Sequence, residues 1–494
     1  MLMKKKQLTE IKSERLSKIR NDLINAPYQL CTQKSYWMTD YFKKNKSIFQ
    51  KFSLSRDVAE KIHYKTYKKT LHAIAQGDQI SDLKVKVNKV MGDFYARKNT
   101  NNISQVLSLS FANAFAHTLE NMELKTYPHE LIVGNCSSKR IGAPVHTDLS
   151  GLLLMSELND LSTRKNNPLE VTDTQIKELE EEIFPFWFNK SILFHTSLNV
   201  DNPNLLNDML TGGFFILTQV AGISHLTPNY EKVLKIGFLG IKKEITNALE
   251  ELKRKPSINK DKEVFLKSAL ISTEAAIMFA KRWEEKLLAD AKAETSSERK
   301  SELEGLAKIF KNIPARPAET FHEALQSIFI THAMVHQENF QHGISFGRLD
   351  QILLPYYLKD QSKGQLNQEK AVELLGCFLG KVAELLPLFF ENATEYFSGL
   401  SSASGITLGG VEQNGSDSVN EVSYLILSAY DQMRLRQPNI HARVHSGTPK
   451  EFLSTCFEVL KKGGGIPALF NDHKIIESLV NQNFSTHDSY NYSI

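Results

Sequence analysis

SGITLGG, at residues 404–410, is the stretch that decides the fold, because it is a short apolar run closed on both sides by glycine. Such a run is typical of a buried β-strand. A second strand-like run, IHARVH, covers residues 440–445. Residues 321–336 and 371–388 are apolar and long enough for helices, the second one broken near Pro387. Helices that alternate with short buried strands predict an α/β fold with parallel strands.

The N-terminal quarter of the chain has a different pattern, polar and mainly helical up to about residue 125. Leu16, Ile19, Leu23 and Ile24 recur at helical spacing and predict one amphipathic face. Further regular segments follow, with strands expected at residues 131–135 and 212–220 and helices at residues 241–253 and 274–292.

Composition excludes several classes of protein. The net charge of +4 is small for 494 residues and argues against a nucleic-acid binder, and the basic run at residues 61–69 is expected to be a solvated helix face. No uninterrupted apolar stretch approaches about 18 residues, so we expect no membrane span. The four cysteines lie far apart without a C-x-x-C pair, which favours a reducing cytoplasm over a disulfide framework.

Histidine-rich segments give no metal site. The run from His322 begins like the zinc motif H-E-x-x-H, but Gln326 replaces its second histidine. His332 and His336 are four residues apart and could share a metal, although no third ligand stands at a natural spacing, so buried structural histidines are the simpler interpretation. Phosphate-loop, dinucleotide-binding and G-x-S-x-G motifs are absent from the sequence.

The cysteines offer no clear nucleophile. Cys136 follows a strand-and-turn signal and is expected to be the most exposed thiol, with His146 ten residues on. Cys377 lies in an apolar run and is expected in the core. We therefore assign no catalytic residue.

An ordered series of segments covers nearly the whole chain: YPHELIVGN (127–135), EIFPFW (182–187), GISHLTPNYEKVL (222–234), PARPAETFHEA (314–324), ISFGRLDQ (344–351), SGITLGG (404–410), RLRQPN (434–439) and GGGIPALFND (463–472). The series resembles the glycyl radical enzymes, the pyruvate formate-lyase family. The resemblance implies one pyruvate formate-lyase-like domain over residues 1–494. Within it we expect a helical N-terminal region at 1–125 and, at 126–494, the first part of a ten-stranded α/β barrel with helical insertions.

The resemblance also implies a radical chemistry that this sequence lacks. In the family a radical SAM activating enzyme generates a protein-based glycyl radical, which oxidises a cysteine to the thiyl that attacks substrate. Residues 488–494 are similar to the sequence just before the family's cysteine motif, G-C-x-E, so we expect a truncated, inactive chain with no bound cofactor. The run from Arg443 to Gly447 resembles the glycine signature R-V-x-G-Y but has the wrong spacing.

Residues that line the substrate cavity are implied by the same resemblance. Phe215, His225, His342, Gly343 and Ser345 match such positions. In glycerol-type dehydratases the position of Gly343 is a serine that binds a substrate hydroxyl, so glycerol is disfavoured here. The alternative for the two histidines is that they are ordinary core groups.

These expectations define one principal function and two rivals. The principal one is the N-terminal part of an anaerobic eliminase or dehydratase-like lyase that acts on a small organic substrate. Its expected partners are the activating enzyme, a separately encoded C-terminal half and a second copy in a homodimer, with no nucleic acid and no membrane. The rivals are the formate C-acetyltransferase branch and a non-catalytic remnant or partner subunit.

Overall fold

The structure of the chain is a computed structural model that describes residues 11–45, 103–149, 154–155, 157–187, 190, 225–338, 343–389, 391, 394 and 401–494. Helices dominate these residues, and the strands form two small parallel sheets. The mixed α/β class and the parallel pairing predicted from sequence are therefore confirmed. The expected first part of a ten-stranded barrel is not confirmed, because the sheets among the described residues have two and three strands.

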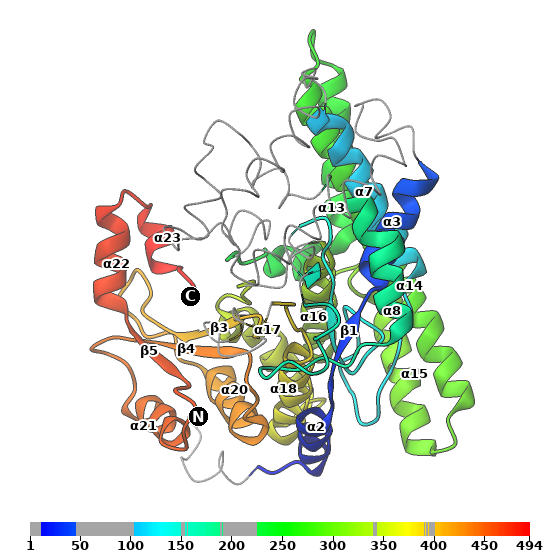
Figure 1. Cartoon of the computed structure of the whole chain (residues 1–494). Coiled ribbons are helices and arrows are strands. Elements are labelled where there is room, and N and C mark those ends of the chain that lie inside the picture. Colours follow the sequence, from blue (N-terminus) through cyan, green and yellow to red (C-terminus); the bar gives the residue numbers. More distant parts are fainter. Residues whose placement is uncertain are drawn as a thin grey trace, which may run out of the picture.

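The elements carry the labels of Figure 1. The helices are α2 (Glu14–Asn25), α3 (Gln33–Lys44), α7 (Ile103–Asn121), α8 (Asp173–Glu178), the π-helix η2 (Leu179–Ile183), α9 (Phe184–Trp187), α13 (Tyr230–Lys253), α14 (Lys260–Ala293), α15 (Ser297–Asn312), α16 (Phe321–Glu338), α17 (Leu349–Ser362), α18 (Gln368–Ala383), α20 (Glu421–Met433), α21 (Lys450–Leu460), α22 (Asp472–Asn481) and α23 (Thr486–Tyr490). The strands are β1 (Tyr28–Cys31), β2 (Ile141–Pro144), β3 (Gly405–Gly409), β4 (Asn439–Val444) and β5 (Ala468–Asn471).

The larger sheet has the order β3-β4-β5, with Thr407 opposite His441. Residues 343–347 run alongside β3, because the Phe346 amide donates to the Gly405 carbonyl at 2.8 Å. Figure 1 shows α20 and α21 below this sheet and α22 and α23 above it. The strands predicted at 404–410 and 440–445 are thus confirmed as β3 and β4.

The smaller sheet pairs β1 with β2 in parallel. Strand β1 lies inside the N-terminal region that was expected to be helical, and it joins that region to residues 141–144 through the backbone. The strand expected at residues 131–135 does not form, so that prediction is wrong. The segment is instead held by a side chain, since Gln326 bonds both the amide and the carbonyl of Val133, at 2.8 and 2.7 Å.

A buried ion cluster fixes the same loop to α18. Glu130 and Glu384 accept from Arg140 at 2.7 Å each, and Lys381 donates to the two carboxyl groups at 2.9 and 2.6 Å. Two cations thus balance two carboxylates in a site where an unpaired charge would be costly. The loop at residues 127–140 therefore has a defined position although it forms no strand.

Helices α16 and α18 lie inside the molecule, and most of their side chains are buried. A helix that is buried on every side is apolar on every side, which matches both segments. Helix α18 ends at Ala383, earlier than the sequence predicts, and α2 packs against it with Leu16, Ile19 and Leu23. Ile24, placed on the same face from sequence, is 55% exposed instead.

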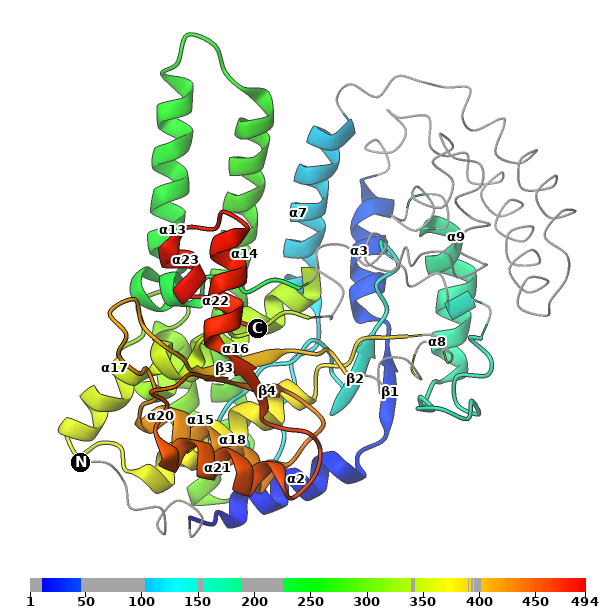
Figure 2. The ribbon, with the colours of Figure 1, turned by 90° about the vertical axis from the view of Figure 1, so that its left-hand side faces the viewer.

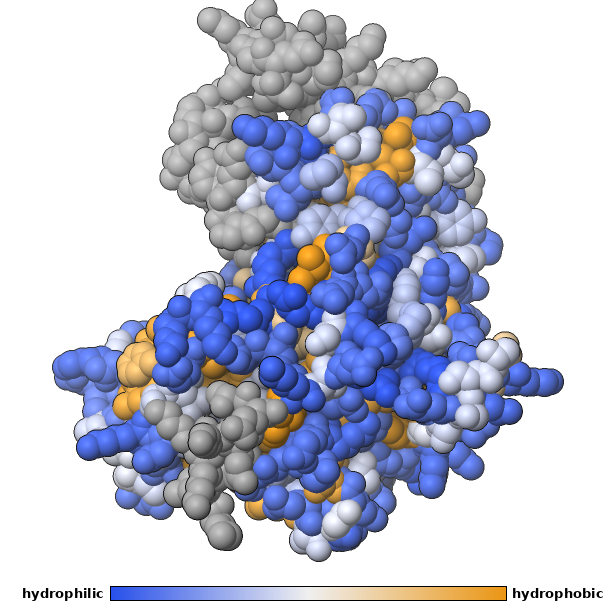
Figure 3. Space-filling view, turned by 90° about the horizontal axis from the view of Figure 1, so that it is seen from below, coloured by the Kyte–Doolittle hydropathy of each residue, from blue (hydrophilic) through white to orange (hydrophobic). Residues whose placement is uncertain are grey.

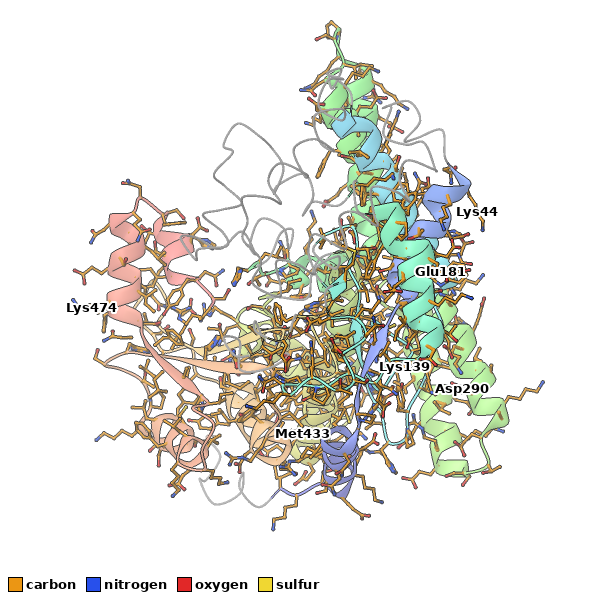
Figure 4. The ribbon with its side chains drawn as sticks, in the orientation of Figure 1. Lys44, Lys139, Glu181, Asp290, Met433 and Lys474 are labelled. Atoms are coloured by element: carbon orange, nitrogen blue, oxygen red, sulfur yellow. The ribbon has the colours of Figure 1, made fainter. Side chains whose placement is uncertain are left out.

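Helix α2 also touches α20, where Arg20 donates to the carbonyl of Met433 at 2.9 Å. Figure 4 shows Met433 at this junction, far from Lys474 on α22 and from Asp290 on α14. The N-terminal helix thus joins two helices that are distant in sequence.

Helices α13 and α14 form a hairpin that projects from the rest of the molecule (Figure 2). The side chains of Asn229 and Asn259 cap the two N-termini by accepting from backbone amides three residues further on, at Lys232 and Lys262. Gly237 has a φ of 62° because residues 314–316 cross the helix there, and a Cβ at this position would stand 2.4 Å from the Ala315 carbonyl oxygen. Only glycine fits this crossing.

The surface is mainly polar on the face seen in Figure 3, with small apolar patches between charged side chains. In the part of the chain that the structure describes, no helix combines the length and apolar character that a bilayer crossing needs. The basic run at 61–69 and the strand expected at 212–220 lie outside the described residues.

Candidate functional site

Three of the five predicted lining residues are described, and the fold brings them together. His225, Gly343 and Ser345 lie on two adjacent extended segments, because Leu226 and Ile344 form a parallel bridge. The Ser345 amide donates to the Leu226 carbonyl at 2.9 Å. Phe215 and His342 lie outside the described residues.

Contact between His225 and Gly343 is unusually close. A Cβ built on Gly343 would stand 2.8 Å from Cδ2 and 3.1 Å from Cγ of the His225 imidazole. Gly343 also has a φ of 67°, a region that side chains disfavour. A serine at this position would therefore collide with the histidine. His225 is exposed, so it is not an ordinary core histidine.

Ser345 is half-buried and faces β3. Its hydroxyl oxygen accepts from the Gly405 amide at 3.2 Å, which leaves the hydroxyl proton available to a ligand. Gly405 has no room for a side chain, since a Cβ there would stand 2.8 Å from the ring of His441 and 3.0 Å from the Ser345 hydroxyl.

Sequence reasoning missed two residues of this neighbourhood, Thr407 on β3 and His441 on β4. The hydroxyl of Thr407 accepts from the Ile494 amide at 3.0 Å, and Nδ1 of His441 contacts the Ile494 carbonyl oxygen at 3.3 Å. Because that oxygen can only accept, Nδ1 of His441 is the donor. The signal was present in the strand pattern, since His441 and Arg443 alternate with Ile440 and Ala442 and must share one face of β4.

Residues 493–494 complete the group from the other side. The hydroxyls of Thr227 and Ser493 are 3.3 Å apart. Burial lowers the pKa of His441, so its imidazole is neutral near pH 7. The cluster of Thr227, Ser345, Thr407 and His441 therefore offers neutral hydrogen-bond donors and acceptors, which suits a small polar organic molecule.

A buried polar chain lies behind this cluster. The Tyr230 hydroxyl contacts Nδ1 of His332 at 2.7 Å, and Nε2 of His332 contacts Nε2 of His336 at 2.9 Å. The Phe346 ring packs against this chain, with its centroid 4.1 Å from that of the His332 ring. Burial lowers the pKa of His332 well below its usual value and that of His336 to about 3. The two Nε2 atoms thus bond each other, which makes the histidines a structural pair rather than two metal ligands.

The segment from His322 to Gln326, which begins like a zinc motif, has a structural role. His322 contacts the Leu131 carbonyl oxygen at 2.6 Å through Nε2, one turn before the Gln326 that holds Val133. Within the described residues, no group of three or more potential metal ligands converges.

All four cysteines of the chain are buried. The expectation that Cys136 is exposed is wrong, because its turn lies under α16 and its thiol contacts the Ala333 carbonyl at 3.2 Å. Cys377 is in the core as predicted, and burial raises its pKa to about 12. Burial also raises the pKa of Cys456 to about 12. These thiols are protonated and shielded, so none of them is placed for catalysis.

A large cleft lies elsewhere, with a volume of about 1100 Å³ between the N-terminus of α2, the α14–α15 turn and α18. Its charged walls are paired with each other, as where Arg299 donates to Glu302 at 2.8 Å. Size alone does not make it the site, because the hydroxyl group with a spare hydrogen-bonding proton is that of Ser345.

Comparison with known proteins identifies the family of the chain. The family model described as "Pyruvate formate lyase-like" matches residues 17–494. Isethionate sulfite-lyase of Nitratidesulfovibrio vulgaris is 32% identical over 79% of this chain and 48% of its own length. Trans-4-hydroxy-L-proline dehydratase of Clostridioides difficile is 32% identical over 75% of this chain and 47% of its own length.

Solved structures give the same result. The glycerol-bound B12-independent glycerol dehydratase of Clostridium butyricum superposes with a TM-score of 0.80 at 26% identity, over 98% of this chain and 54% of that one. A glycyl radical enzyme of Archaeoglobus fulgidus gives a TM-score of 0.81 at 29% identity, over 97% and 54%. The chain spans about half the length of the relatives it matches. It belongs to the pyruvate formate lyase-like family, together with the glycyl radical lyases and dehydratases.

Proposed function

We propose that this chain forms the substrate-binding N-terminal part of a glycyl radical lyase of the eliminase or dehydratase type. The observation that carries the proposal is the meeting of His225, Gly343 and Ser345 on adjacent parallel segments. The relatives named above as a sulfite-lyase and a dehydratase support the reaction class.

The proposed substrate is a small polar molecule that bears a leaving group. Ser345 would donate its free hydroxyl proton, and His225 would contact the substrate from the position that a serine fills in glycerol-type enzymes. Phe215 and His342 remain proposed lining residues. The thiyl radical that abstracts hydrogen would form on the family's cysteine loop, because the four cysteines described above are buried.

The proposal includes partners that follow from the same chemistry. A radical SAM activating enzyme would generate the glycyl radical, and a homodimer is expected by analogy with the family. The second half of a ten-stranded barrel would pack beside β5, on which Leu469 is 38% exposed. That half would come from further sequence or from a separate polypeptide.

A rival function is favoured by the name of the matching family model, "Pyruvate formate lyase-like". That name fits a formate C-acetyltransferase, which would use pyruvate and coenzyme A. A non-catalytic remnant is the third possibility. The three are separated by one assay.

The assay uses the full-length protein with an activating enzyme and S-adenosylmethionine under strict anaerobiosis. Isethionate, trans-4-hydroxy-L-proline, propane-1,2-diol and glycerol are offered in parallel with pyruvate plus coenzyme A. We expect elimination from one of the first three and at least a tenfold lower kcat/KM in Ser345→Ala, since a lost hydrogen bond of about 1.4 kcal/mol is tenfold. His487→Gln, an exposed residue of α23, is the control. Formate from pyruvate would establish the rival, and a radical without any turnover would favour the remnant.

A further inference from the structure

Arg443 is the most elaborately bonded side chain near the site, and it is fully buried. Its Nε and Nη2 donate to the two carboxyl oxygens of Asp472 at 2.8 and 3.1 Å. Nη1 donates to the Tyr492 carbonyl at 3.0 Å and Nη2 to the Tyr490 carbonyl at 2.9 Å. One guanidinium therefore joins β4, α22 and residues 490–492.

The surroundings of Arg443 hold its plane in one orientation. The Tyr492 ring lies 4.0 Å from the guanidinium carbon on one side. Gly410, with a φ of 107°, also approaches so closely that a Cβ there would stand 2.6 Å from Nε. Asp472 is fixed as well, because it accepts from the Val411 amide at 2.7 Å and from the Tyr492 hydroxyl at 2.6 Å.

These bonds decide where residues 490–494 lie. From Tyr492 the backbone continues to Ser493, which meets Thr227, and to Ile494, which meets Thr407 and His441. The segment thus crosses from β4 to the strand-like segment that carries His225. It closes one side of the group around Ser345.

We propose that Arg443 and Asp472 form a clamp that positions residues 490–494 as a wall of the substrate site. The inference rests on the proposed function for the identity of the site, but the position of the wall can be tested without turnover. A lysine could not replace Arg443, because its ammonium is a point charge without the planar fork that reaches a carboxylate and two carbonyls together. Both clamp residues are positioning residues, since neither contacts the site itself.

The test is a disulfide trap across the site. The double variant Thr227→Cys/Ser493→Cys replaces two hydroxyls that are 3.3 Å apart, a separation that small side-chain rotations bring to the length of a disulfide. The four native thiols are buried and should not compete. We expect rapid cross-linking in the otherwise unchanged chain, measured by gel shift after a mild oxidant.

Clamp variants are then added to the same background. Arg443→Lys and Tyr492→Phe should slow cross-linking by about tenfold, the effect of losing a hydrogen bond to a charged partner. Arg299→Lys is the matched control, because Arg299 also bonds one carboxylate and two backbone carbonyls, those of Glu130 and Tyr127, but away from the site. It should leave the rate unchanged.

Two results would overturn the proposal. One is the absence of a cross-link in the parent double variant, which would mean that residues 490–494 do not lie at the site. The other is an equal cross-linking rate in the parent double variant and in the variant that also carries Tyr492→Phe. This comparison tests the proposal even where Arg443→Lys does not fold. An inactive full-length enzyme would count against the proposed function and leave the cross-link result standing.

Discussion

The imidazole of His225 lies against the α-carbon of Gly343, so closely that a single added carbon on the glycine would stand 2.8 Å from the ring. The two residues come from segments more than a hundred positions apart in the chain. Because of this contact, the histidine at position 225 requires that position 343 carry no side chain.

Replacing Gly343 by alanine should reveal this contact as a loss of stability. Gly364 provides a matched control, because its φ of 66° is nearly the same as the 67° of Gly343 and nothing lies within 4 Å of its added Cβ. Both alanine variants lose about 1 kcal/mol for the left-handed backbone. Gly343→Ala should lose about 1–3 kcal/mol more, the range of overpacking, in urea unfolding.

A double variant extends the comparison. Combining Gly343→Ala with His225→Ala should recover most of the additional loss, because the colliding ring is gone. Equal destabilisation by Gly343→Ala and Gly364→Ala would show that the ring moves aside freely, and would remove the steric basis for the site.

Helix packing provides a second prediction. A Cβ at Gly376 of α18 would stand 2.4 Å from Cδ1 of Leu16 on α2, whereas Gly305 of α15 has nothing within 4 Å. Gly305→Ala should stabilise the chain by about 0.5–1 kcal/mol through helix propensity. Gly376→Ala has the same propensity gain but should be net destabilising by about 1–2 kcal/mol because the two helices must separate. Thermal unfolding of both variants measures the difference, and an increase in Tm for Gly376→Ala would contradict it.

Buried histidines predict a loss of stability in acid. Burial lowers the pKa of His322 to about 4, with a smaller contribution from Lys370, and an unfolded histidine has a pKa of about 6.5. Above about pH 6.5 both states are neutral, so the histidine contributes no pH dependence. As the pH falls from 6.5 towards 4, only the unfolded state takes up the proton, and stability is lost at up to about 1.4 kcal/mol per pH unit.

The variant His322→Gln isolates this effect. Its free energy of unfolding should depend less steeply on pH between pH 6.5 and 4.5, measured by urea titration at each pH. At pH 8 its free energy of unfolding should differ from that of the parent only through the altered bond to the Leu131 carbonyl. Parallel stability curves for the two chains would mean that His322 becomes protonated in the folded state without cost.

A polypeptide of these 494 residues should not support radical chemistry alone. Its four cysteines are buried, and burial raises the pKa values of Cys377 and Cys456 to about 12. Incubation with an activating enzyme and S-adenosylmethionine should therefore give neither lyase nor acyltransferase product. Electron paramagnetic resonance of the same sample is the measurement that checks this. A glycyl-type doublet from this chain would contradict the prediction.

The amino-acid sequence by itself determined the elements whose causes are local. A glycine-bounded apolar run predicted β3 and a strand-like run predicted β4. Apolar runs predicted the buried helix α16 and placed Cys377 of α18 in the core. The ordered series of segments was enough to recognise the family. These features follow from side-chain periodicity and turn residues, which act over a few positions and can be recognised without knowing what packs against them.

Only the tertiary structure decided the contacts between distant segments. Cys136 was expected at the surface and lies under α16, and residues 131–135 were expected as a strand but are held by Gln326. The contact of His225 with Gly343 and the clamp of Arg443 on residues 490–492 depend on strand register and on which helix crosses which loop. A linear pattern cannot specify these, because a one-residue shift in register leaves the local pattern unchanged and moves every side chain to the other face.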